Sequence, residues 1–267
     1  MTRFSPSPGR YFRARALGPL FALLMTAACA TPAMNDGGND VNDPLESMNR
    51  AIFSFNQFAE GLLFKPLAMM YRDLVPPPVQ DAVAGILETL RTPVTLANDL
   101  LQGEPDRAAE TLGRFAINAT VGIAGIFDIA SGLGLEGHDE DFGQTLAVWG
   151  SGEGMYLVLP LLGPSSVRDG IGLGVDTLFD PLSYYASFKQ QAGRTATRGI
   201  VELSGVIDSL DEIERTSLDY YATLRSLYRQ QRADQIRNGA AAPVVPIPSL
   251  SLDDFDTPVG ELITLAE

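Results

Sequence analysis

Apolar residues recur at intervals of three or four through much of this chain, which is the spacing of one face of an α-helix. The first such run begins at Pro44 and covers residues 44–63. Its face is set by Leu45, Met48, Ile52, Phe55, Ala59 and Leu62, and is widened by Phe53, Phe58 and Leu63. Periodicity alone leaves two interpretations open: a helix that faces the core of a bundle, and a helix that presents a wide apolar face to lipid.

Prolines mark the next boundaries, because proline lacks the amide donor that a continuing helix needs. Residues 75–78 (VPPP) are predicted to end the first helical section, and a second helix follows from residue 79 until Pro93 stops it. A third helix is predicted to begin at Pro105, with Glu104 and Asp106 complementing the dipole at its start, and to continue through Ile126.

Residues 115–127 (FAINATVGIAGIF) carry no charge, so this stretch must be buried in protein or in lipid. Thirteen residues are too few to span a bilayer, which takes about 20 residues of helix. Small residues at Ala119, Gly122 and Gly125 would allow a neighbouring backbone to approach closely.

The second half of the chain contains Gly-rich segments and further helical patterns. Residues 155–160 suit a short extended piece, and Trp149 suits either a membrane interface or a core. A helix is predicted over 166–179 with a stop at 180–181, and a long helix over 195–237 with a bend at 204–205. The tail, 239–267, combines prolines with acids and is expected to be extended or disordered. No strand alternation is sustained, so the predicted class is all-α.

The amino terminus reads as a lipoprotein signal peptide. Basic residues precede an uncharged run, 16–28, that is too short to remain as a membrane span. The run ends at Cys29, the only cysteine of the chain, after small residues that resemble a lipobox. The alternative is an ordinary export signal with an incidental cysteine. Acylation of Cys29 after removal of residues 1–28 explains the solitary thiol and would anchor the chain firmly.

Residues 29–43 are polar and rich in Gly, Asn and Asp, and are predicted to form a flexible tether. The residue after the cysteine is Ala30 rather than Asp. Asp at this position in lipoproteins resembles an inner-membrane retention signal, so Ala30 favours the outer membrane. The predicted organisation is therefore a signal peptide (1–28), a tether (29–43), one helical domain (44–238) and a tail (239–267).

Charge and composition exclude several functions. Without residues 1–28 the chain keeps 15 basic and 33 acidic residues, a formal charge of −18, which excludes nucleic-acid binding by charge and repels anionic lipid headgroups. One His and one Cys cannot form a Cys/His zinc site, and no G-x-S-x-G elbow occurs. No metal or other cofactor is expected, and a hydrolase would have to depend on His138.

Three further patterns have a functional and a plain interpretation. The glycine repeats at 150–154 and 170–174 lack the strand and lysine of a phosphate loop, so they do not indicate nucleotide binding. The acidic stretch 136–141 suits a solvated loop better than a hard cation site. Charges beside apolar segments suit either an amphipathic passage or ordinary helix ends, and these residues are Arg114, Asp128, Glu153, Arg168, Asp169 and Asp176.

Several motifs in a fixed order resemble one known family. Residues 43–50 read DPLESMNR and are followed by FSFN at 53–56. The later segments are YRDLVP (71–76), NDLLQG (98–103), RF with Asn118 and Gly122 (114–122), FDIA (127–130), FGQTL (142–146), YLVLP (156–160) and 163–169 with Arg168. Over about 43–185 the chain is similar to the VacJ or MlaA lipoproteins.

This resemblance implies a fold and a function. It implies a compact ring- or wedge-like set of amphipathic helices within the outer membrane's inner leaflet, with Gly-rich loops, a long C-terminal helix and an amphipathic channel. It further implies a trimeric porin as partner, phospholipid as the transported ligand and a periplasmic shuttle protein as its receiver, and hence a role in lipid asymmetry. The chain would remove phospholipid misplaced in the outer leaflet and would not be an enzyme.

The resemblance also nominates residues. Met48, Asn49, Ile52 and Phe53 are candidates for the channel gate, and Cys29 carries the lipid. The other motif and channel candidates are Arg50, Arg72, Asp73, Arg114, Asn118, Asp128, Phe142, Gly143, Pro160, Gly163, Arg168 and Asp169. Two competing hypotheses remain: a periplasm-facing scaffold or binding lipoprotein with a closed core, and a phospholipase centred on His138.

Overall fold

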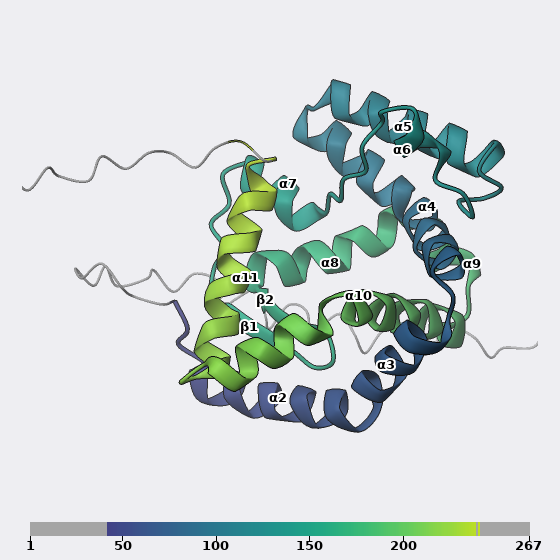
Figure 1. The fold of residues 1–267 in the computed structure, drawn as a ribbon. Helices are drawn as coiled ribbons and strands as arrows, with labels where there is room; N and C mark the ends of the chain where they lie inside the picture. The colour runs from purple at the N-terminus through teal and green to yellow at the C-terminus, as the bar shows by residue number, and fades with distance from the viewer. Residues whose placement is uncertain (1–41, 239, 241–267) are drawn as a thin grey trace, which may run out of the picture. The chain divides into compact units, whose positions relative to one another are not determined.

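The computed structural model describes residues 42–238 and 240, which belong to one compact unit. The signal peptide, Cys29, most of the tether and nearly all of the tail lie outside the described residues. The helices and strands of this unit are shown in Figure 1, and most of it is helical. The all-α expectation is thus confirmed, with one short hairpin as the exception.

A nearly continuous helical segment forms the first section. It consists of α2 (Glu46–Ala59), a π-helical turn (Glu60–Phe64) and α3 (Lys65–Leu74), and it ends before the proline run as predicted. The wider π turn rotates the helix by about one residue position, which shifts the apolar face between α2 and α3.

Helix α4 (Pro77–Gln102) contradicts the prediction that Pro93 stops the second helix, because it continues through that proline. Proline inside a helix removes one hydrogen bond and costs about 3 kcal/mol. The turn after it is the most buried part of α4 and includes Asn98 and Asp99, whose side chains bond to other elements. These tertiary contacts offset the cost, and no local pattern shows them.

Helix α5 (Pro105–Thr120) begins where predicted but ends before Ile126. Ile123, Ala124 and Gly125 adopt left-handed φ angles of 53°, 56° and 89°, so the chain turns back, and the Gly125 amide donates to the Asn118 carbonyl at 2.9 Å. A Cβ on Gly85 of α4 would lie 2.2 Å from the Gly125 carbonyl oxygen. The expected close backbone approach is therefore real, with α4 as the neighbour.

Short elements fill the centre of the chain. They are α6 (Ile129–Gly132), α7 (Phe142–Val148), and the strands β1 (Tyr156–Leu159) and β2 (Gly163–Ser166), which pair antiparallel with Tyr156 opposite Ser166. Strand β1 is the short extended piece that the sequence predicted. Helices α8 (Val167–Phe179) and α9 (Leu182–Tyr185) follow, separated at Asp180 and Pro181 as expected.

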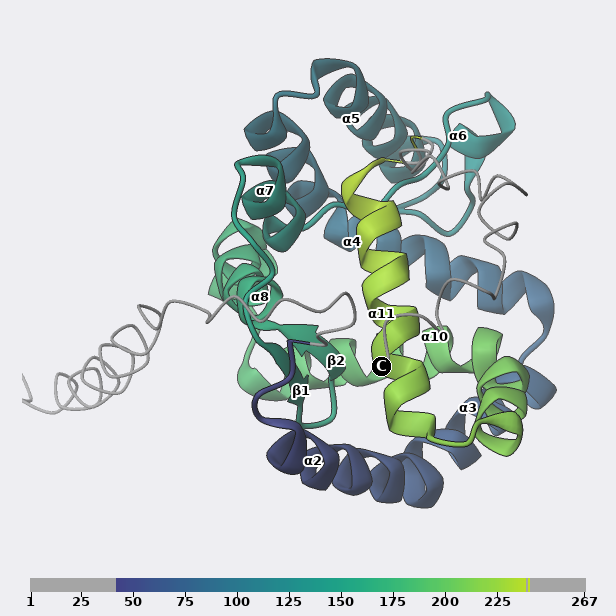
Figure 2. The ribbon, with the colours of Figure 1, turned by 90° about the vertical axis from the view of Figure 1, so that its left-hand side faces the viewer.

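The predicted single helix over 195–237 is wrong, because the structure has two. Helix α10 (Phe188–Thr216) runs through residues 204–205 without interruption, and α11 (Tyr220–Ile236) starts after a break at 217–219. Asp219 causes the restart: its carboxylate accepts a hydrogen bond from the Ala222 amide at 3.1 Å, which caps α11. In Figure 2, α11 extends from α2 toward α7.

Aromatic packing holds the hairpin against α2 and α11. The small apolar core contains Phe53, Tyr156, Val158 and Tyr221. The rings of Phe53 and Tyr221 meet edge to face, with centroids 5.5 Å apart. No described helix is both long and apolar enough to cross a membrane.

Candidate functional site

The described unit has an unusual distribution of polarity. Its largest fully buried side chains are Gln144, Glu140, Asn49, Asn98, Thr145, Asp99 and Ser166, all of them polar. Many large apolar side chains are exposed instead, including Phe58 at 67%, Leu62 at 69% and Phe188 at 84%. A water-soluble domain normally buries the second kind and exposes the first. Two features therefore need a functional account: the polar interior and the apolar exterior.

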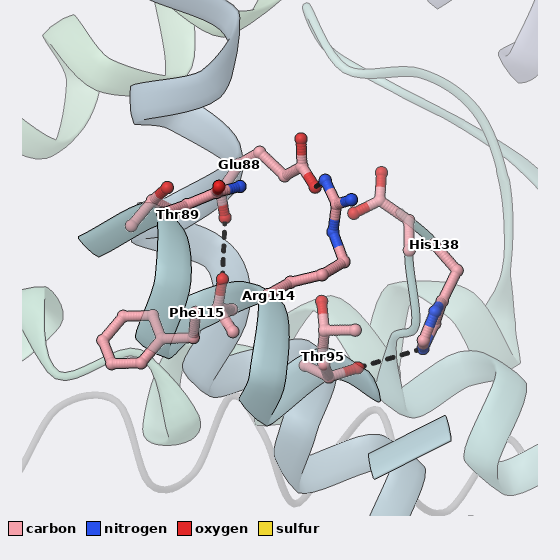
Figure 3. A pocket seen from close by; sticks show the side chains of 10 residues that line it. Glu88, Thr89, Thr95, Arg114, Phe115 and His138 are labelled. Carbon is pink, nitrogen blue, oxygen red and sulfur yellow. Dashed lines mark hydrogen bonds and ion pairs between the residues drawn. The ribbon is translucent and has the colours of Figure 1, made fainter. Parts of the chain in front are cut away.

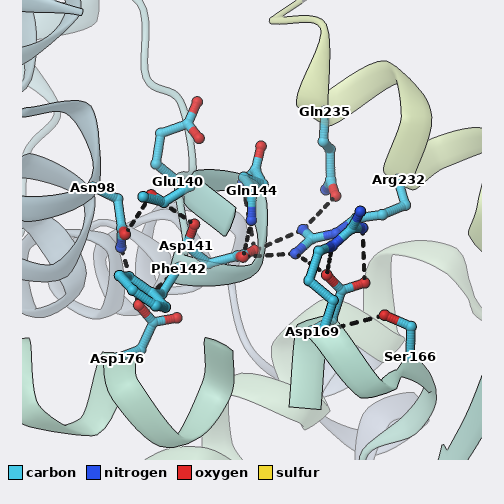
Figure 4. A network of polar contacts seen from close by, with 12 residues as sticks. Asn98, Glu140, Asp141, Phe142, Gln144, Ser166, Asp169, Asp176, Arg232 and Gln235 are labelled. Carbon is cyan, nitrogen blue, oxygen red and sulfur yellow. Dashed lines mark hydrogen bonds and ion pairs between the residues drawn. The ribbon is translucent and has the colours of Figure 1, made fainter. Parts of the chain in front are cut away.

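The first polar cluster surrounds Arg232 of α11 (Figure 4). Its guanidinium makes two hydrogen bonds to Asp141, of 2.6 and 2.7 Å, and a third of 2.9 Å to Asp169. Arg168 and Tyr228 also donate to Asp169. Glycine is needed at position 143, since a Cβ there would lie 2.5 Å from both Arg232 and Asp169. This cluster joins α7, α8 and α11.

Charge in this cluster shifts the pKa of its carboxyls. Burial would raise the pKa of Asp169, but hydrogen bonds from Arg232, Arg168 and Tyr228 lower it to about 2. The pKa of Asp141 is lowered as well, because hydrogen bonding and charge from Arg232 outweigh burial. Both aspartates are therefore held as carboxylates.

The second polar cluster lies where α5, α6 and the turn between them meet. Arg114 donates to Glu88 of α4 at 2.6 Å and to Asp128 at 3.3 Å, and Asn118 donates to Asp128 at 2.9 Å. Burial would raise the pKa of Asp128, but hydrogen bonds from Ser131 and Asn118 lower it to about 2. The structure thus brings the motif residues Arg114, Asn118 and Asp128 together.

The third polar cluster attaches the hairpin to α2. Asn49 has no exposed surface. Its side chain donates to the Tyr156 carbonyl and accepts from the Val158 amide, both at 3.0 Å, and so forms hydrogen bonds to the backbone of β1 as a neighbouring strand would. It also donates to Asp43 at 2.7 Å. Two turns later on α2, Asn56 bonds in the same way to Leu159 and Leu161.

Asp43, the first residue of the DPLE motif, is buried beneath this attachment. Its carboxylate accepts hydrogen bonds from Asn49, Tyr221 and Arg225, the last at 2.7 Å. Arg50 lies over the Tyr221 ring, with its guanidinium carbon 4.4 Å from the centroid, and pairs with Glu46 and with Asp219 at the start of α11. The DPLE-x-x-NR motif therefore joins α2 to β1 and to α11.

The gate candidates separate into two groups. Asn49 and Phe53 are buried against the hairpin, and Ile52 packs partly buried on the same core. Met48 is exposed. Their role as a gate stays a prediction.

The remaining candidates lie in three separate places. Arg72 pairs with Asp73 and Asp208 on an exposed surface, and Phe142 packs edge to face on Trp149. Pro160 is exposed at the end of β1, and Gly163 starts β2 with a φ of 82°. Trp149 is 56% exposed, so the structure does not place it in a core.

The acidic loop is solvated only in part, because Glu136 and Asp139 are exposed as expected while Glu140 and Asp141 are not. Glu140 is 1% exposed and pairs with Arg107 at 2.8 Å, while Asp141 belongs to the Arg232 cluster. Burial raises the pKa of Glu140. The arginines that neutralise this loop come from distant segments, which is why local sequence gave the wrong interpretation. Among the described residues no cluster of His, Cys, Asp and Glu fits a metal ion.

The surroundings of His138 do not form a catalytic relay. Its Nε2 lies 3.1 Å from the Thr111 hydroxyl and 3.0 Å from Asp99, while that hydroxyl donates to Asp99 at 2.6 Å. A relay needs the nucleophile and the carboxylate on opposite ring nitrogens. Here both contact the same nitrogen, so the geometry argues against the phospholipase hypothesis.

Comparison with known proteins decides the family. The family model described as MlaA lipoprotein matches residues 41–235. The chain belongs to the MlaA lipoprotein family.

Relatives and a solved structure agree with this assignment. The chain is 32% identical over 221 residues to "Intermembrane phospholipid transport system lipoprotein MlaA" of Shigella flexneri, covering 80% of this chain and 85% of the relative. It is 34% identical over 203 residues to an uncharacterized protein of Rickettsia bellii, covering 76% and 80%. A chain solved under the description "Structural basis for maintenance of bacterial outer membrane lipid asymmetry" superimposes with a TM-score of 0.67 at 32% identity, covering 73% of this chain and 98% of that one.

The arginines of α11 are functional residues that the sequence patterns did not predict. Arg225 and Arg232 lie beyond the MlaA-like motifs that we recognised, yet they neutralise Asp43, Asp141 and Asp169. A signal was present, because Tyr221, Arg225, Tyr228 and Arg232 are spaced by four, three and four residues and so share one helical face. Arginines on the face that carries the buried tyrosines predict buried acidic partners.

The lowered pKa values predict acid sensitivity. A carboxyl whose pKa is lowered on folding stabilises the fold above its ordinary value, here 3.8, and that stability is lost as pH falls toward 2. Asp169 should account for about 2 kcal/mol of this loss. We expect the thermal midpoint in detergent to fall between pH 4 and pH 2, and Asp169→Asn to flatten that fall. A profile equally steep in Asp169→Asn would refute the assignment.

Proposed function

We propose that this chain is an outer-membrane lipoprotein that takes part in intermembrane phospholipid transport. In this proposal it removes mislocalised phospholipid from the outer leaflet through an amphipathic passage and passes it to a periplasmic shuttle protein, with a trimeric porin as its partner in the membrane. The names of the relatives support phospholipid transport, and the family supports a lipoprotein of the cell envelope.

The reversed polarity is the observation that carries the proposal. Exposed apolar side chains occur on α2 and α3, on the turn after α5, on the hairpin loop and around α9. Each large apolar side chain gains about 1.5–3 kcal/mol when it leaves water for an apolar medium. A surface of this kind favours lipid over water, although no helix within residues 42–238 is both long and apolar enough to cross the bilayer.

The polar interior fits a body that lies in lipid. Charges are tolerated at membrane depth only where they face one another or a polar cavity. Arg232, Arg225 and Arg114 each pair with carboxylates inside the unit. Such a body could offer a phospholipid headgroup a polar route while its acyl chains remain against the apolar exterior.

The lipid anchor completes the proposal. Cys29 would hold the chain in the leaflet that faces the periplasm, and the apolar surface would set the depth of the helical unit. Because the formal charge of −18 repels anionic headgroups, the anchor and the apolar surface must provide the attraction.

Phospholipid at the cell surface tests the function. We expect deletion of the gene to raise outer-leaflet phospholipid and detergent sensitivity, and the wild-type gene to restore both. Cys29→Ser should fail to restore them, because the protein would be mislocalised although its helical unit still folds. Unchanged outer-leaflet phospholipid in the deletion strain would overturn the proposal.

A further inference from the structure

A cavity of about 310 Å³ lies between α4 and α10, beside the loop that follows α6. Helix α4 contributes Ala84, Leu87 and Glu88 to its walls, and α10 contributes Arg198, Val201 and Glu202. The loop contributes Gly137, His138 and Asp139. The cavity therefore has apolar walls with charged groups on three sides, which is the usual composition of a small-molecule site.

The charged groups of this cavity are three carboxylates and one guanidinium. Arg198 donates to Glu202 at 2.6 Å and to Asp139 at 3.3 Å, and Glu88 accepts from Arg114 at 2.6 Å. Glu88 and Glu202 each use only Oε1, and their Oε2 atoms accept no hydrogen bond from any residue that the structure describes. Likewise, Nη1 of Arg198 donates to no group within residues 42–238.

A second, smaller cavity adjoins the first and shares Glu88, His138 and Asp139 with it (Figure 3). Its volume of about 20 Å³ is enough for a single water molecule. Thr95, which lines it, is 4% exposed.

The pattern of unused groups defines the chemistry of a ligand. Two carboxylate oxygens accept hydrogen bonds from a cation that carries N–H donors, and one guanidinium nitrogen donates to an anion. A divalent metal is a poor match, because no described cluster of acidic and imidazole groups fits a metal ion. An anionic headgroup without an amine meets Arg198 but offers no N–H donor to the unused oxygens of Glu88 and Glu202.

We propose that this cavity binds the headgroup of an aminophospholipid, with its primary ammonium between Glu88 and Glu202 and its phosphodiester at Arg198. This inference rests on the proposed function, since it names the class of phospholipid that the transport site prefers. The zwitterion matches the paired charges of the cavity, and Leu87 and Val201 contact the carbon atoms next to the headgroup.

Lipid retention tests this assignment. The acylated full chain is incubated with vesicles that contain equal parts of phosphatidylethanolamine, phosphatidylglycerol and phosphatidylcholine, and the retained lipid is then measured by mass spectrometry. Phosphatidylcholine is informative because its trimethylammonium carries charge but donates no N–H hydrogen bond. We expect phosphatidylethanolamine to be enriched about fivefold over phosphatidylglycerol, as two partly exposed ionic hydrogen bonds would produce, and less strongly over phosphatidylcholine.

Variants distinguish lipid binding in this cavity from a lipid preference of the protein surface in general. Glu202→Gln should reduce the enrichment, and Glu88→Gln with Glu202→Gln should remove it. Glu212→Gln is the matched control, because Glu212 is also a carboxylate of α10 paired with an arginine but does not line the cavity. Thermal unfolding confirms that each variant folds, and the single Glu202→Gln variant leaves the Arg114 pair intact.

The outcomes distinguish the two proposals. Retention of all three lipids in equal amounts, or equal enrichment in the wild type and the double variant, overturns the headgroup site while phospholipid transport stands. Retention of no phospholipid by the wild type overturns both.

Discussion

Replacing Arg232 with alanine is expected to lower the free energy of unfolding by about 3–5 kcal/mol. The variant leaves Asp141 and Asp169 facing each other without their shared cation, and both are largely buried. Two carboxylates in such a place repel each other and lack solvation. The measurement is denaturant unfolding of the detergent-solubilised protein, followed by circular dichroism.

A neighbouring arginine supplies the control. Arg229 lies on the same helix and pairs with Glu153 at 3.0 Å, but both side chains are about a third exposed. Arg229→Ala should therefore cost less than about 1 kcal/mol. Neutralising one carboxyl with Asp141→Asn in the Arg232→Ala background should recover part of the loss. Equal losses in the two arginine variants would mean that the Arg232 cluster is not the anchor that we describe.

Replacing Asn49 with alanine is expected to cost about 2–5 kcal/mol and to loosen the hairpin. The variant leaves the Val158 amide and the Tyr156 carbonyl without partners, in two residues that are each 2% exposed. Each orphaned buried group costs about 1–3 kcal/mol. Hydrogen exchange should show the change directly, since the Val158 amide would lose its acceptor and exchange faster.

Asn56 provides the comparison for Asn49. It makes the same kind of pair of backbone hydrogen bonds at the end of β1, to Leu159 and Leu161, but it is only partly buried and water can replace it. Asn56→Ala should cost about 1 kcal/mol and leave the Val158 amide protected. If Asn49→Ala leaves exchange at Val158 unchanged, the attachment of the hairpin to α2 does not depend on Asn49.

The elements that sequence predicted correctly are those with local causes. Pro105 at the start of α5, the stop at Asp180 and Pro181, and the short extended piece of β1 all follow from the backbone chemistry of nearby residues. Two of the wrong boundaries have different origins. Helix α4 passes Pro93 because tertiary contacts override a local penalty, whereas the break before α11 had a local signal, the Asp219 cap, that apolar periodicity concealed.

The polar interior could be predicted only in part. Motif residues such as Asp43, Asn49, Asp128 and Asp169 were recognised, but their environments were not, because their partners are distant in sequence. Asp43 meets Arg225 across 182 residues, and Asp141 meets Arg232 across 91. Periodicity reports which face of a helix is apolar. Periodicity does not show whether the fold buries or exposes that apolar face. In this structure the fold largely exposes it.

The central claim is that the exposed apolar face places the helical unit in lipid, and this claim can be tested without the lipid anchor. A truncated chain of residues 30–267 lacks Cys29 and so cannot be acylated, and the measurement is whether it still requires lipid. We predict that it is purified only with detergent, and that it aggregates when detergent is removed unless phospholipid vesicles are supplied, with which it then sediments. A monomer that is stable in buffer without detergent and that ignores vesicles would contradict the account, and would favour a lipid-anchored scaffold with a closed core.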